Sequence, residues 1–105
     1  MTVKLRTFDA ARYLETEDDI SCYLEDVLKQ NNPRLLNVAL GDIARARGMT
    51  EVARKVGVSR ESLYRSLSED GNPSAATLLK VFHALGYELY PRKRLEDDSS
   101  LAMAG

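Results

Sequence analysis

Residues 57–68, GVSRESLYRSLS, place two arginines, a glutamate and a tyrosine on the few turns of one potential helix. An arginine guanidinium can hold the O6 and N7 atoms of guanine in a fork, and a glutamate can accept a hydrogen bond from the amino group of cytosine. A tyrosine can contact a thymine methyl group or a phosphate. The base contacts that these residue types predict are Arg60, Glu61, Tyr64 and Arg65.

Simpler roles remain open for two of these side chains. Glu61 and Arg65 are four residues apart, in the order that favours an ion pair on a helix, so Glu61 could serve mainly to orient Arg65. Tyr64 could pack against a neighbouring helix. A helical wheel places Leu63 and Leu67 on the side opposite Arg65, so that side is expected to be buried.

Other side chains near this segment suit phosphate contacts, which position a protein on DNA without reading its sequence. Hydroxyl and amide groups and helix N-termini can donate to phosphate oxygens. Basic side chains hold the backbone electrostatically and make binding depend on salt, although Lys55 is equally well explained as a solvated charge. The phosphate contacts expected are Thr50, Arg54, Lys55, Ser59, Ser62 and Asn72.

Two short helices must position these groups. Thr50 is expected to cap the first, and Ser59 is expected to cap the second, which runs to about Ser68. Gly57 between them can take the left-handed conformation without a Cβ penalty. Apolar residues on both helices are spaced to pack them at a steep angle, which predicts a helix-turn-helix over residues 49–68.

Further helices are predicted on both sides of this pair. Asp19 follows Thr16 by three residues, as in a capping box. Gly41 inside a helix costs about 1 kcal/mol relative to alanine, so we expect a close helix crossing there. Residues 87–90 predict a short strand or an extended arm. The fold class expected is all-α with about six helices, the additional four lying near residues 9–14, 16–31, 33–47 and 74–86 and capped by Asp9, Thr16, Asn32 and Ser74.

Charge divides the chain into an acidic front and a basic middle. Residues 1–32 carry a net charge of −3, whereas residues 45–65 carry +4. Accidental clustering on a solvated surface is the alternative explanation. We expect an acidic N-terminal helical extension over residues 1–32 packed on the domain, a DNA-binding domain over residues 33–91 and a flexible tail over residues 92–105.

Composition argues against several other classes of protein. No apolar run approaches the roughly 18 residues of a membrane span, and the first ten residues lack the apolar core of a signal peptide. Cys22 is the only cysteine, so an intramolecular disulfide is impossible and a cytoplasmic location is expected. Cys22 and His83 are too few for a zinc site, and no nucleophile–base pair or glycine-rich phosphate loop is evident. We therefore expect no metal, no cofactor and no enzymatic activity.

Two stretches, FDAARYL and ALGDIARARGMTEVARKVGVSRESLYRSLSEDGNPSAATLLKVFHALGYEL, resemble the addiction-module antidote proteins over about residues 8–89. These are HigA-like antitoxins with a phage-repressor-like DNA-binding fold of the xenobiotic-response-element (XRE) type. The chain departs from the family at Ser66, where an apolar residue is usual, and Leu67 could replace it in the packing. The resemblance implies a toxin of the RelE/ParE fold, encoded upstream, and repression of the shared operon.

The acidic extension is the natural contact for that toxin, because toxins of this fold are usually basic and opposite charges speed and orient encounters. The toxin contacts expected are Glu17, Asp18, Glu25 and Asp26. The alternative is that this helix is an outer layer of the domain whose charges face water. Both can be true together.

A homodimer on a palindromic operator is also expected, because one helix-turn-helix makes few base contacts. Candidates for its seam, some of which must instead fill the monomer core, are Leu78, Phe82, Leu85, Tyr87, Leu89 and Tyr90.

The function expected is that of a sequence-specific DNA-binding antitoxin of a type II toxin–antitoxin module, which neutralises its toxin and represses its own operon. The alternative is a phage-repressor-like transcriptional regulator that has the same DNA-reading surface and no toxin partner.

Overall fold

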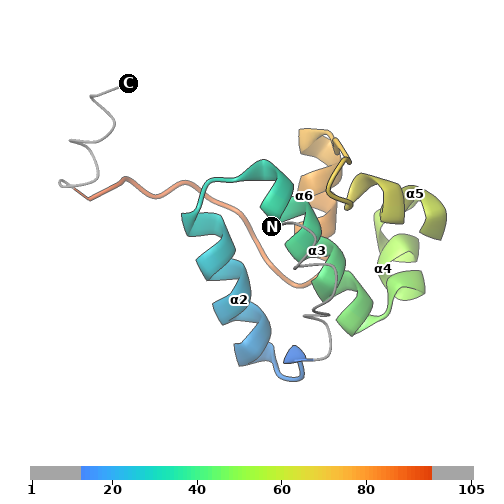
Figure 1. Cartoon of the computed structure of the whole chain (residues 1–105), viewed down its shortest axis with the longest axis horizontal. Coiled ribbons are helices and arrows are strands. Elements are labelled where there is room, and N and C mark those ends of the chain that lie inside the picture. The colour runs from blue at the N-terminus through green and yellow to red at the C-terminus, as the bar shows by residue number, and fades with distance from the viewer. Residues whose placement is uncertain (1–12, 96–105) are drawn as a thin grey trace.

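The structure is a computed structural model that describes residues 13–95. Within this range the chain has no strand, so the all-α fold class is confirmed for the described part. The helix expected at residues 9–14 lies mostly outside it. The helices, in chain order (Figure 1), are α2 (Glu17–Lys29), α3 (Pro33–Arg47), α4 (Met49–Val56), α5 (Arg60–Ser66) and α6 (Ala75–Ala84).

Four of these helices begin at the side-chain caps that the sequence predicted. At α2 the capping box is reciprocal: Thr16 Oγ1 accepts from Asp19 N at 3.0 Å, and Asp19 Oδ2 accepts from Thr16 N at 3.1 Å. Each such cap satisfies a backbone N–H group that the helix itself leaves unpaired. The other three caps are Asn32 at α3, Ser59 at α5 and Ser74 at α6.

The cap predicted for α4 is wrong. The helix begins at Met49, and Thr50 lies exposed in its first turn. Gly48 is at once the C-cap of α3 and the N-cap of α4, and its φ of 112° turns the chain between the two helices. Because glycine tolerates this backbone conformation, no further loop residue is needed and α4 starts two residues earlier than predicted.

One hydrophobic core joins the helices. Figure 1 shows α3 running through the middle of the molecule, with α2 on one side and α4 and α5 on the other. α2 packs on α3 and buries Ile20, Leu24 and Val27, so it is a layer of the same core. The largest fully buried side chains are Leu40, Ile43, Leu63, Val81 and Leu85.

α3 and the end of α5 approach closely at Gly41, as predicted. A Cβ atom at Gly41 would lie only 2.8 Å from the backbone oxygen of Leu67, so a larger residue would push the two elements apart. Leu67 itself is 4% exposed, whereas Ser66 is half-buried. Leu67 therefore takes the packing position that Ser66 does not fill.

After α6 the chain is extended, and it forms no strand. Tyr87 anchors this turn: its N–H donates to the Phe82 oxygen at 2.9 Å, and its hydroxyl shares a hydrogen bond of 2.8 Å with Ser21 Oγ on α2. Residues 88–95, called the arm below, then run past α2 and away from the helices (Figure 1). Among residues 13–95 no helix is long and apolar enough to cross a membrane.

Candidate nucleic-acid interface

α4 and α5 form a tightly joined pair. Gly57 ends α4 in the left-handed conformation with a φ of 90°, and its N–H donates to the Ala53 oxygen at 2.8 Å. The next residue, Val58, donates to the same oxygen at 3.1 Å. Val52 and Val56 of α4 are buried in the core beside Leu63 of α5. The buried sides of the two helices are therefore fixed by the core, and the outer face of α5 lies in solvent.

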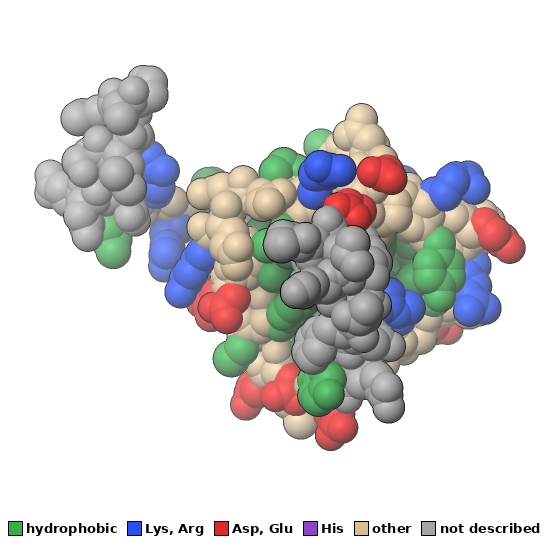
Figure 2. All heavy atoms as spheres, viewed as in Figure 1, with side chains coloured by type: hydrophobic (Ala, Val, Ile, Leu, Met, Phe, Trp, Pro, Cys, Tyr) green, Lys and Arg blue, Asp and Glu red, His purple; other side chains and the backbone are tan. Residues whose placement is uncertain are grey.

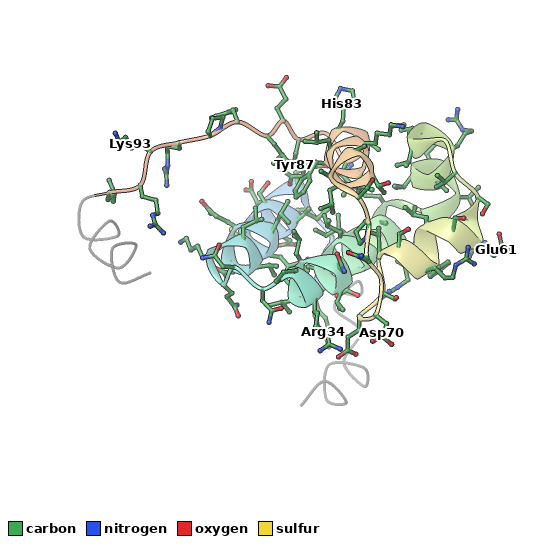
Figure 3. All side chains as sticks on the ribbon, turned by 90° about the horizontal axis from the view of Figure 1, so that it is seen from above. Arg34, Glu61, Asp70, His83, Tyr87 and Lys93 are labelled. Carbon is green, nitrogen blue, oxygen red and sulfur yellow. The ribbon has the colours of Figure 1, made fainter. Side chains whose placement is uncertain are left out.

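All four base contacts predicted from the sequence lie on that outer face. Arg60, Glu61, Tyr64 and Arg65 are exposed, whereas Leu63 is 1% exposed. Figure 3 shows Glu61 pointing away from the body at the far end of the molecule. Ser59 caps the helix here through a 3.0 Å hydrogen bond from Ser62 N to its Oγ. A seven-residue helix is thus presented with its polar side outward.

Arg60 and Tyr64 contact each other. The Cζ atom of Arg60 lies 5.7 Å from the centroid of the Tyr64 ring, a cation–π geometry. The other side of Tyr64 borders a hollow of about 190 Å³ between α3 and α5, which is also lined by Val38 and Leu67. Tyr64 therefore contacts a predicted base reader and also borders the hollow that separates α5 from α3.

Arg65 is oriented by Ser62. Its Nη2 atom lies 3.4 Å from Ser62 Oγ, a long hydrogen bond. Within residues 13–95 no ion pair joins Arg65 to Glu61. Glu61 is consequently available to a partner rather than committed to steering Arg65.

The predicted phosphate contacts are spread over α4, α5 with its cap and the loop before α6, and Lys55 borders a hollow that α6 and residues 87–90 line. Thr50, Lys55 and Asn72 are exposed, and the Arg54 guanidinium is paired with Glu51. The hydroxyl oxygens of Ser59 and Ser62 each accept a hydrogen bond, which leaves their hydrogens free to donate. Figure 2 shows Lys and Arg side chains around the end of the molecule formed by α4 and α5, and acidic side chains around the start of α2.

The loop that carries Asn72 is fixed against α3. Asn37 is 6% exposed and donates through Nδ2 to the Gly71 oxygen at 3.0 Å. A Cβ atom at Gly71 would lie 2.2 Å from the Ser66 oxygen, so only glycine fits there. The position of Asn72 is therefore set by α3 and α5 together.

A buried polar group under this surface was missed at the sequence level. Asp42 is 8% exposed, accepts from Tyr23 Oη at 2.9 Å and accepts from Arg45 Nη2 at 2.8 Å. Burial, and then the Asp42 carboxylate, raise the pKa of Tyr23 above its ordinary value. The contact between Asp42 and Arg45 could have been predicted, because the two residues are three apart on one helix. Tyr23 is 19 residues from Asp42 in the sequence, so spacing does not reveal their hydrogen bond.

Of the predicted toxin contacts on α2, three are exposed and lack an ion pair within the described range: Asp18, Glu25 and Asp26. Glu17 is different, because it accepts from Arg47 Nη2 at 2.7 Å. No group of His, Cys, Asp or Glu side chains in residues 13–95 is arranged to hold a metal ion.

Two of the predicted dimer-seam residues are corrected. Phe82 on α6 and Leu85 at its C-cap are 3% and 1% exposed and belong to the buried cluster, so they fill the monomer core. Leu78 and Tyr87 are half-buried against that core. Of the predicted set, Leu89 and Tyr90 remain exposed, and Leu79, which the prediction omitted, is 55% exposed.

Comparison with known proteins identifies one family. A family model described as "Probable addiction module antidote protein" matches residues 4–92. An uncharacterized protein of Haemophilus influenzae is 49% identical over 88 residues, which cover 84% of this chain and 91% of that protein. No solved structure matches the chain. Because the family match spans most of the chain, from before α2 to beyond α6, the chain belongs to the family of addiction module antidote proteins.

Proposed function

We propose that this protein is a sequence-specific DNA-binding antitoxin: it binds double-stranded operator DNA through α5, represses its own operon and neutralises a toxin of the RelE/ParE fold. The observation that carries the DNA-binding part is the exposed face of α5, where Arg60, Glu61, Tyr64 and Arg65 lie on one short, capped helix. Membership of an antidote family supports the toxin-binding part.

The architecture around α5 supports reading of the major groove. A phage-repressor-like helix-turn-helix places the first residues of its second helix against base edges. Arg60 is the first residue of α5, and Arg65 lies about one and a half turns further on, so the two guanidinium groups reach different base pairs. The net charge of +4 over residues 45–65 attracts the phosphate backbone.

α2 is the surface proposed for the toxin. Its exposed carboxylates, Asp18, Glu25 and Asp26, would attract a basic protein and orient its approach. α2 also packs on α3 through a continuous apolar face, so it offers these carboxylates on a rigid support. This surface lies away from α5, which allows toxin and DNA to be bound by separate parts of the molecule (Figure 1).

Co-expression with the basic reading frame expected upstream tests the antitoxin role. The proposal expects the two proteins to co-purify, and it expects growth of cells that produce the toxin to be rescued. Asp26→Lys should weaken both effects, whereas Glu61→Lys, which makes the same charge change on α5, should leave them intact. DNA binding without co-purification and without rescue would mean a transcriptional regulator that has no toxin.

A further inference from the structure

The apolar and basic side chains of the arm are exposed to solvent. Leu89 is 49% exposed and Tyr90 is 78% exposed, and the three residues Arg92, Lys93 and Arg94 that follow are all exposed. Within residues 13–95 no hydrogen bond or ion pair ties residues 88–94 to the rest of the chain. Apolar residues clustered on an exposed segment mark a surface for a partner.

A hollow of about 290 Å³ lies between α2, α6 and the base of the arm. Its floor is apolar, formed by Leu24, Leu28 and Phe82, and two carboxylates, Glu25 and Glu88, stand among its lining residues. Leu28 also lines a second hollow of about 370 Å³ where α2 meets α3. A segment with an aromatic residue and cations suits this hollow, because the aromatic ring can pack on the apolar floor and the cations can pair with the two carboxylates.

The arm has that combination, and its charge is opposite to that of α2. Asp18 and Glu25 are seven residues apart, so they lie two turns apart on one face of the helix. The extended arm spans about 26 Å over eight residues, enough to run along a helix of about 20 Å. In the structure, however, the arm points away from its own α2, and Figure 3 shows Lys93 well clear of the helices.

We propose that two copies of this chain exchange arms in a two-fold symmetric dimer. Tyr90 of each copy enters the hollow between α2 and α6 of the other, and Arg92 and Arg94 lie against that copy's Asp18 and Glu25. The arm and the toxin therefore compete for these two carboxylates, and Asp26 is the proposed toxin contact that the arm leaves uncovered. In a two-fold symmetric dimer each contact between the arm and the other copy occurs twice, so two short arms together form the interface. Because α5 lies at the opposite end of the molecule from the arm (Figure 1), both copies keep α5 exposed.

Disulfide trapping tests the proposed contact directly, and it requires neither DNA nor toxin. The only cysteine of the chain, Cys22, is exposed on α2 between Asp18 and Glu25. Oxidised Lys93→Cys should therefore give a covalent dimer on a non-reducing gel. Arg65→Cys, on α5 at the opposite end of the molecule from the arm, should give far less, and so should Lys93→Cys combined with Cys22→Ser.

Three outcomes would overturn the proposal. One is equal trapping in the Lys93→Cys and Arg65→Cys variants. Another is a crosslink within one chain, which would place the arm on its own α2. The third is trapping that survives Cys22→Ser, which would show that the two arms pair with each other instead.

Charge exchange gives a second test, by sedimentation equilibrium. The wild type should be a dimer, and Arg92→Glu with Arg94→Glu should raise its dissociation constant by about tenfold or more. Adding Asp18→Arg and Glu25→Arg should restore the dimer, whereas Arg60→Glu with Arg65→Glu should leave the mass unchanged. A monomeric wild type contradicts the proposal, and so does a dimer whose dissociation constant is unchanged by Arg92→Glu with Arg94→Glu. If the wild type is a monomer and still co-purifies with the toxin, the hollow is assigned to the toxin instead.

Discussion

The guanidinium group of Arg60 lies over the ring of Tyr64, with 5.7 Å between its Cζ atom and the ring centroid. The contact links the first residue of α5 to a residue one turn later, on the side of the helix that faces solvent. A cation–π contact at an exposed site contributes about 0.5–1 kcal/mol. Two residues that were predicted as separate base readers therefore form one unit, in which the ring orients the guanidinium.

Replacing the ring should consequently weaken DNA binding through Arg60. We expect Tyr64→Leu to lower affinity for the protein's own promoter by about twofold to fivefold, the equivalent of the lost contact. Tyr64→Phe keeps the ring and should bind nearly as tightly as the wild type. Fluorescence anisotropy with a labelled promoter duplex measures both variants. If Phe and Leu lower the affinity equally, the hydroxyl matters and the stacking account of Tyr64 is wrong.

Ser59 has two separable roles, as the cap of α5 and as a proposed phosphate contact. Ser59→Ala removes the 3.0 Å cap hydrogen bond and should lower the free energy of unfolding by about 1 kcal/mol. Ser59→Asp keeps a capping oxygen but sets a negative charge beside the phosphates, so stability should be retained while DNA affinity falls. Urea unfolding and anisotropy together check this, and unchanged DNA affinity in Ser59→Asp would place the phosphates elsewhere.

Gly41→Ala should destabilise the protein, although this change usually stabilises a helix. The added Cβ would lie 2.8 Å from the Leu67 backbone oxygen, which cannot move away like a side-chain tip. We expect a loss of about 1–3 kcal/mol in the free energy of unfolding. Ala46→Gly, at an exposed position of the same helix, serves as a control for helix propensity alone, at about 1 kcal/mol. A Gly41→Ala variant as stable as the wild type would rule out the close crossing.

Tyr23 predicts a loss of stability at high pH. Its pKa is raised in the folded protein by burial and by Asp42, so the unfolded chain loses the phenol proton first, near pH 10. The contribution is therefore complete below pH 10 and declines as pH rises from there toward the folded pKa. Urea unfolding from pH 8 to 11 should show a shallower decline for Tyr23→Phe than for the wild type, with Tyr90→Phe as an exposed control. Parallel profiles for Tyr23→Phe and the wild type would contradict this role.

Local signals in the sequence predicted much of the fold. The caps at Thr16, Asn32, Ser59 and Ser74 are each made by a side chain acting within three residues, and such contacts depend little on the rest of the chain. Thr50 shows the limit of this reasoning: it is a good capping residue, but the positive φ of Gly48 starts α4 before it.

Contacts between distant segments were harder to predict. The position of Leu85 on the apolar stripe of α6 was read correctly, but its assignment to a dimer seam or to the core depends on whether α4 covers that stripe. Similarly, the link from Tyr23 to Asp42 requires the packing of α2 on α3. The wheel placed Arg65 and Glu61 opposite the buried side that Leu63 and Leu67 define, but it left Arg60 and Tyr64 on the flank, and only the structure shows these two exposed as well.

The most direct test of the central claim is the ratio of affinities for the protein's own promoter and for a base-shuffled duplex of equal length, measured at fixed salt. The wild type should strongly prefer its promoter, and Arg60→Ala with Arg65→Ala should lose most of that preference, since each fork contact discriminates by about 1–3 kcal/mol. Lys55→Ala should weaken binding to both duplexes alike, and Lys29→Ala, on α2, should change neither. An unchanged ratio in the double arginine variant would contradict the account, because α5 would then not be the element that reads the operator.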